Sequence, residues 1–109
     1  MLKKADRVSR TDFESHLKGG KRFHCDYATL IFQPSKTFQG SVVVSKKVSK
    51  KAVERNTIRR RIYAMLYTQK KADRVGVYMV MVKPPYQTLT KQAAQAQMKQ
   101  LIERATKSA

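Results

Sequence analysis

Hydrophobic and polar positions follow two different periods along the chain, and these predict where strands and helices lie. Between residues 23 and 32 successive side chains alternate, which predicts a strand with Ile31 on one face and Leu30 and Phe32 on the other, Phe32 towards the core. Two further runs also predict strands. They are Ser41–Ser45, which follows a turn containing Pro34 and Gly40, and the wholly apolar run Gly76–Val82.

Three stretches predict helices. Ser9 and Asp12 have the spacing of a capping box at the start of a short helix that Gly19 and Gly20 end. The stretch 50–67 lacks glycine and proline, and its apolar residues Ile58, Ile62, Met65 and Leu66 fall within an arc of about 100°, which is the expected core side. After Pro84 and Pro85, a last helix is expected over residues 88–105.

The predicted order of elements is α-β-β-α-β-α, without repeats or linkers. This order favours one domain over residues 1–109, a two-layer α/β sandwich. We expect the strands 23–32 and 41–45 to form a hairpin. The run Gly76–Val82 is expected at the centre of the sheet, because strands buried on both faces are apolar throughout.

The net charge of the chain narrows the classes of molecule that it is expected to bind. Its 109 residues carry 24 Lys and Arg against 7 Asp and Glu, a net charge of +17. Nucleic acid is the commonest partner of such a surplus, because each neutralised phosphate releases counterions. No apolar run reaches the ~20 residues of a membrane span, and the first ten residues lack the apolar region of a signal peptide. A single cysteine, Cys25, excludes an internal disulfide and favours a cytoplasmic protein.

The basic residues concentrate around the helix predicted over 50–67. Ala52, Asn56, Arg59, Arg60, Tyr63 and Tyr67 share an arc beside the apolar one, and Arg55 lies at the border. A solvated face usually mixes Lys with Glu, whereas Arg55 and Arg59 repel each other at a spacing of four. Arginine binds phosphate through two parallel hydrogen bonds. The Asn56 side chain has the chemistry to contact a sugar, a base edge or a hydrated metal ion. The ring of Tyr63 or Tyr67 has the chemistry to stack on an unpaired base.

The run Ala52–Arg60 behind Lys46 and Lys47 resembles the Arg-Asn-Arg signature of the bacterial ribonuclease P protein subunit. Similarity to that family also covers Arg7, Asp12-Phe13, Gly20–His24, Thr29-Leu30 and Pro84, nearly the whole chain in order. Two positions depart from the family. Tyr63-Ala64 stands where another arginine, often followed by Glu, is usual, and Ser49 stands near a frequent glycine. Arg61 carries a charge close to Tyr63 but points elsewhere on the helix.

The resemblance implies a subunit of the ribonucleoprotein that cleaves precursor tRNA at its 5′ end. The catalyst in this family is the RNA subunit, which uses magnesium ions, and the protein assists. The resemblance also implies an S5 domain 2-like fold with a left-handed β-α-β crossover. The residues expected to bind RNA are Lys46, Lys47, Lys50, Lys51, Arg55, Asn56, Arg59, Arg60 and Tyr63. The residues expected at the substrate leader are Phe13, Arg22, Leu30 and Lys46, and Phe13 is equally well explained by packing.

The acidic residues do not suggest a protein active site. All seven are dispersed along the chain, whereas metal-dependent hydrolysis needs clustered carboxylates. His16, His24 and Cys25 have no fixed catalytic partner in the sequence. The polypeptide is therefore expected to cut nothing by itself, to need no membrane and to have no obligatory protein partner. Two alternatives stay open, a structural RNA-binding protein without a role in cleavage and a protein-only nuclease.

Overall fold

The computed structural model describes residues 19–72 and 75–107. The helix predicted after Ser9, which contains Phe13, lies outside the described residues. The described elements, in chain order, are β1 (Lys21–His24), β2 (Ala28–Gln33), β3 (Phe38–Val43), α2 (Ala52–Lys71), β4 (Gly76–Val82), the 3-10 helix η2 (Pro84–Thr88) and α3 (Lys91–Lys107).

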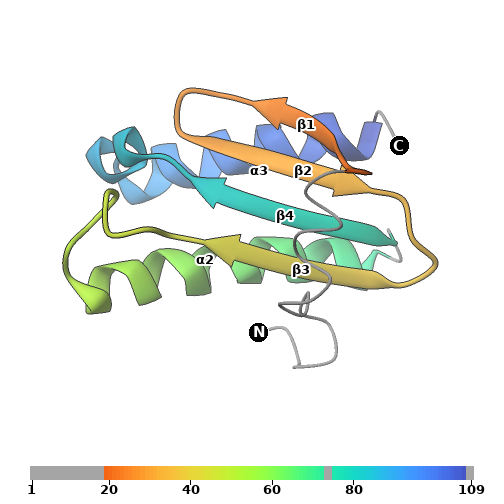
Figure 1. Ribbon diagram of the computed structural model, residues 1–109, viewed down its shortest axis with the longest axis horizontal. Coiled ribbons are helices and arrows are strands. Elements are labelled where there is room, and N and C mark those ends of the chain that lie inside the picture. Colours follow the sequence, from red (N-terminus) through yellow and green to blue (C-terminus); the bar gives the residue numbers. More distant parts are fainter. Residues whose placement is uncertain (1–18, 73–74, 108–109) are drawn as a thin grey trace.

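The described strands form one sheet in the order β1-β2-β4-β3. β2 pairs antiparallel with β1 and β4, and β3 pairs parallel with β4. Figure 1 shows α2 and α3 side by side on one face of this sheet. With both helices behind the sheet, the β3-α2-β4 connection in Figure 1 has the left-handed sense, as the resemblance implied and against the general rule. The two-layer architecture is confirmed.

Two predictions about the first strands are wrong. The expected strand 23–32 is a hairpin of β1 and β2, closed where the Cys25 N–H donates to the Ala28 carbonyl at 3.0 Å. The expected hairpin between this region and β3 does not form either, because β4 lies between β2 and β3. Alternation continues through a tight hairpin, so it does not reveal the turn at Asp26. Strand pairing depends on β4, which needs a partner strand on each side.

The core occupies the space between the sheet and the helices. Ile58, Ile62 and Leu66 of α2 are buried there, and Met65 lies half-buried beside them. Leu30 and Phe32 belong to this same cluster. A second buried cluster on the opposite face of the sheet contains Ile31, Val77 and Met79. β4 is therefore buried on both faces, which explains its unbroken apolar sequence and confirms its central position.

The last helix begins later than its apolar pattern predicts. Pro84 and Pro85 start η2 instead of the first turn of a long helix. Thr90 then caps α3, because its hydroxyl accepts a hydrogen bond from the Ala93 N–H at 3.1 Å. Among the residues that the structure describes, no helix combines the length and the apolar character needed to cross a bilayer.

Candidate nucleic-acid interface

Helix α2 has three kinds of surface. One stripe, containing Ile58, Ile62 and Leu66, is buried in the core. One side lies next to α3, and the other lies next to β3, the strand at the free edge of the sheet. We call the β3 side the basic flank and define it by Asn56, Arg59, Arg60, Tyr63 and Tyr67. The predicted arc of RNA-binding side chains is thus one continuous strip of one helix.

The loop before α2 is held by hydrogen bonds around Ser49. This side chain is buried, and its hydroxyl accepts the Lys51 N–H at 3.2 Å and donates to Glu54. Gln87 of η2 donates to the same Glu54 oxygen, Oε2, at 2.9 Å. Arg55 Nη1 donates to the Ser49 carbonyl at 2.9 Å. The side chain of Ser49 therefore ties the loop to the first turn of α2.

This network positions four cations. Lys46, Lys47, Lys50 and Lys51 are all exposed and lie on either side of the buried Val48 and Ser49. Burial of this pair fixes the backbone of the loop, while the ammonium groups stay in solvent. Since an ordered backbone reduces the entropy lost when the lysines bind phosphate, the loop is suited to continue the basic flank.

The arginines of α2 differ in their surroundings. Arg60 is exposed, and Arg59 donates a hydrogen bond to the side-chain oxygen of Asn56. Arg55 is half-buried, with one nitrogen engaged by Ser49. Arg60 is therefore best placed to meet a phosphate, while Arg55 also stabilises the loop. The amide oxygen of Asn56 is already used as an acceptor, so RNA contact through that oxygen requires exchange of this bond.

Tyr63 has a structural contact that sequence reasoning missed. Its hydroxyl accepts the Val42 N–H at 3.2 Å, and its ring packs against the core. β3 pairs with β4 on one side only, so this contact covers an amide at the free edge of the sheet. The expected stacking of Tyr63 on a base stays a prediction, limited to the exposed part of its ring.

Replacing Tyr63 with phenylalanine tests this assignment. We expect the free energy of unfolding to fall by about 1 kcal/mol, because the Val42 N–H loses its acceptor, while RNA affinity is unchanged. Urea unfolding and equilibrium RNA binding measure the two quantities, and Tyr67→Phe is the matched control. Lost RNA affinity at unchanged stability would place the hydroxyl on RNA instead.

Arg61 lies on a different side of α2 from Tyr63. It lines a groove on the α3 side of α2 together with Tyr86 and Gln87. Burial raises the pKa of Tyr86, and the nearby Arg61 charge partly offsets that rise. The guanidinium of Arg61 thus faces η2, away from the basic flank, as its helical angle predicts.

Glu54 is the acidic residue of α2, and its removal has a definite expected cost. In a Glu54→Ala variant the Ser49 hydroxyl and the Gln87 amide both lose their acceptor, and the first turn of α2 loses a favourable negative charge. We expect the free energy of unfolding to fall by about 2 kcal/mol. Glu103→Ala in α3 is the control, with an expected change below about 0.5 kcal/mol. If denaturant titrations gave equal losses of unfolding free energy for Glu54→Ala and Glu103→Ala, the network around Ser49 would not contribute to stability.

The residues predicted to bind the substrate leader are not all brought together. Leu30 has no exposed surface and packs between the sheet and the helices, so its predicted contact with a leader is not supported. Arg22 is exposed on β1, whereas Lys46 is exposed beyond the end of β3. β1 and β3 are opposite edges of the sheet, about 14 Å apart at three strand spacings. Phe13 lies outside the described residues.

The other reactive side chains have local structural partners. His24 Nδ1 lies 3.1 Å from the Thr29 hydroxyl across the β1–β2 hairpin, and Lys83 Nζ donates to the Cys25 carbonyl at 2.8 Å. Within residues 19–72 and 75–107, no group of three His, Cys, Asp or Glu side chains is arranged to hold a metal ion. Among the described residues, the exposed Arg60 and the four lysines of the loop before α2 are therefore groups with the chemistry to contact a polyanion.

Comparisons with known proteins identify the family and the fold of the chain. The model of the ribonuclease P family matches residues 1–106. A ribonuclease P protein component from Picosynechococcus sp. is 45% identical over 53 residues, which are 47% of this chain and 46% of that protein. The alignment thus spans about half the length of the curated relative. The solved Staphylococcus aureus RNase P protein is 24% identical with a TM-score of 0.77, covering 95% of this chain and 94% of that chain. A mutant of the S. aureus protein with defective mRNA degradation activity gives the same TM-score at 23% identity, covering 95% of this chain and 87% of that one.

Proposed function

The chain belongs to the ribonuclease P family, and we propose that it is the protein subunit of a bacterial ribonucleoprotein that removes the 5′ leader from precursor tRNA. The observation that carries this proposal is the basic flank of α2, continued by four exposed lysines on a loop that Ser49 and Glu54 hold in place. Its partner is the catalytic RNA subunit, and its place of action is the cytoplasm. Cations arranged on a rigid helix contact phosphates without the cost of first ordering the backbone that carries them.

In this proposal the RNA subunit performs the cleavage and binds most of the magnesium. The donor set of the polypeptide supports that division. The described carboxylates, Asp26, Glu54 and Glu103, lie on three different elements, and Glu54 is occupied by hydrogen bonds from Ser49 and Gln87. Magnesium sites in proteins usually need one or two carboxylates that face a shared water-filled site. The polypeptide then contributes affinity and position to an RNA-catalysed hydrolysis.

The leader of precursor tRNA is the second proposed ligand. A single strand of variable sequence is held by cations along its backbone and by apolar platforms for its bases. Arg22 and Lys46 are exposed cations with this chemistry, and Phe13 is the expected platform. Because Arg22 and Lys46 lie at opposite edges of the sheet, they are proposed to contact different parts of the RNA rather than one nucleotide.

A reconstituted cleavage assay tests the proposed function. Precursor tRNA is incubated with magnesium in three mixtures: with this protein alone, with cognate catalytic RNA alone, and with the protein and the catalytic RNA together. The ends of the products are then mapped. We expect cleavage at the mature 5′ end, with rates at low magnesium raised only when both are present. Cleavage by the protein alone would favour a protein nuclease. Binding of the catalytic RNA without any rise in rate would favour a structural RNA-binding protein.

A further inference from the structure

Positive charge on α2 continues beyond the basic flank. Arg59, Arg60 and Arg61 are consecutive, so their side chains leave the helix at steps of about 100°. Arg60 and Arg61 are both exposed, and Arg61 lies on the side of α2 that faces η2 and α3. On α3, the exposed Lys99 lies beside the second half of α2. A polyanion bound to the basic flank therefore finds further cations on the α3 side.

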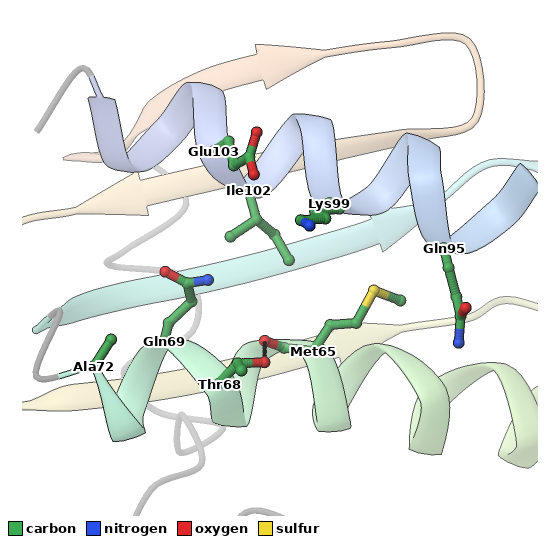
Figure 2. A pocket seen from close by; sticks show the side chains of 8 residues that line it. All are labelled: Met65, Thr68, Gln69, Ala72, Gln95, Lys99, Ile102 and Glu103. Carbon is green, nitrogen blue, oxygen red and sulfur yellow. Dashed lines mark hydrogen bonds between the residues drawn. The ribbon is translucent and has the colours of Figure 1, made fainter. Parts of the chain in front are cut away.

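A cleft of about 520 Å³ opens between α2 and α3 on this side. Met65 and Gln69 point from α2 towards α3, and Gln95 and Ile102 point from α3 towards α2 (Figure 2). Lys99 and Glu103 border the cleft on α3. Pockets of this size bind small organic groups, whereas an added helix is 10–12 Å wide and needs a longer groove.

The lining of the cleft has the chemistry of a nucleobase site. The half-buried Met65 provides an apolar wall of the kind that accepts the face of an unstacked base, and the buried Ile102, 2% exposed, forms the floor of the cleft. Glutamine side chains such as Gln95 read the edge of adenine through two hydrogen bonds, and the Glu103 carboxylate accepts from exocyclic amino groups. Lys99 supplies a cation for the phosphate next to the base. One apolar wall, polar groups that can read a base edge and one cation thus come together between two helices.

We propose that the α2–α3 cleft binds one purine nucleotide of a single-stranded RNA segment, with its base against Met65 above the buried Ile102 and its phosphate at Lys99. This site is separate from the basic flank and from the residues expected at the leader. Charge complementarity favours RNA as the occupant, since the chain carries a net charge of +17. The identification of the occupant as RNA rests on the proposed function.

Methyl NMR of the full chain with labelled methionine tests the site. We expect a short oligoadenylate to shift the Met65 methyl resonance, while Met79 and Met98, which are 0% and 1% exposed, stay unchanged. An abasic ribose-phosphate strand of the same length should leave Met65 unshifted. Gln95→Ala should weaken oligoadenylate binding about tenfold. Gln100→Ala, an exposed glutamine of the same helix outside the cleft, should not change it.

Three results with the RNA strands would overturn the proposal. They are an unmoved Met65 methyl, equal shifts with the abasic strand, and equal weakening by Gln95→Ala and Gln100→Ala. Free AMP that shifts Met65 where oligoadenylate does not would also overturn it, since the cleft would then bind mononucleotides and not RNA. None of these results affects the reconstituted cleavage assay, so failure of the cleft and failure of the proposed function are distinguished.

Discussion

Replacing Arg59 and Arg60 together with alanine is expected to lower the slope of log affinity for the catalytic RNA against log salt concentration by about 2. Each arginine that neutralises a phosphate releases about one condensed counterion. We expect the affinity at low salt to fall about 100-fold, since each charge-assisted contact contributes roughly a factor of ten. Equilibrium binding over a salt series measures both quantities.

A second pair of cations provides the control for this experiment. Lys36 lies in the β2–β3 turn and Lys91 at the start of α3, and both are exposed. The variant Lys36→Ala/Lys91→Ala removes the same charge from positions off the basic flank, so its slope should change much less. Equal changes of slope in the two double variants would mean that RNA affinity depends on the total charge of the protein and not on the position of the arginines on α2.

Replacing Gly76 with alanine should nearly unfold the protein. Gly76 begins β4 with a φ of +135°, a conformation that side-chain-bearing residues rarely adopt. A Cβ atom there would lie 2.5 Å from Cε2 of Phe32, whose ring packs against Tyr78 at a centroid distance of 5.1 Å. Backbone strain and overpacking together predict a loss of about 4 kcal/mol, a large part of the stability of a small domain.

Gly19→Ala is the matched control for Gly76→Ala. A Cβ atom at Gly19 would meet the flexible end of the Gln33 side chain at 3.3 Å, which can move aside. We therefore expect a change within about 0.5 kcal/mol at Gly19, measured by denaturant unfolding of both variants. Similar stabilities for the two variants would show that the contact with Phe32 relaxes without cost.

The sequence predicts α2 and β4 well because their signals are local. The apolar stripe Ile58, Ile62 and Leu66 marks the core side of α2, and the run Gly76–Val82 marks a strand buried on both faces. Strand pairing is not local: the turn between residues 34 and 40 predicts a hairpin of the strands on either side of it, whereas β2 and β3 both pair with β4. The handedness of the crossover followed only from the family resemblance, because the general rule predicts the opposite hand.

In the candidate site, too, local features can be predicted from the sequence and contacts between distant residues cannot. Angles of about 100° per residue place Arg59 and Arg60 on one flank and Arg61 on another, as the structure has them. Alternation shows that Leu30 and Ile31 point to opposite faces of the sheet but does not show which face packs against the helices. The expected contact of Leu30 with RNA therefore finds no support, because Leu30 lies in the core. The bond between Glu54 and Gln87 joins residues 33 positions apart, a contact that sequence spacing does not reveal.

Directed hydroxyl-radical probing of the holoenzyme tests most directly whether α2 lies against the catalytic RNA. Cys25 is replaced with serine, and an iron chelate is attached to a cysteine introduced by Ala64→Cys, on the exposed side of α2 one turn beyond Arg60. The comparison variant carries Asp26→Cys in the exposed β1–β2 turn, across the sheet from β3. If α2 lies against the catalytic RNA, we expect strong, localised cleavage of that RNA from position 64 and much weaker cleavage from position 26. Strong cleavage from position 26 with none from position 64 would contradict it.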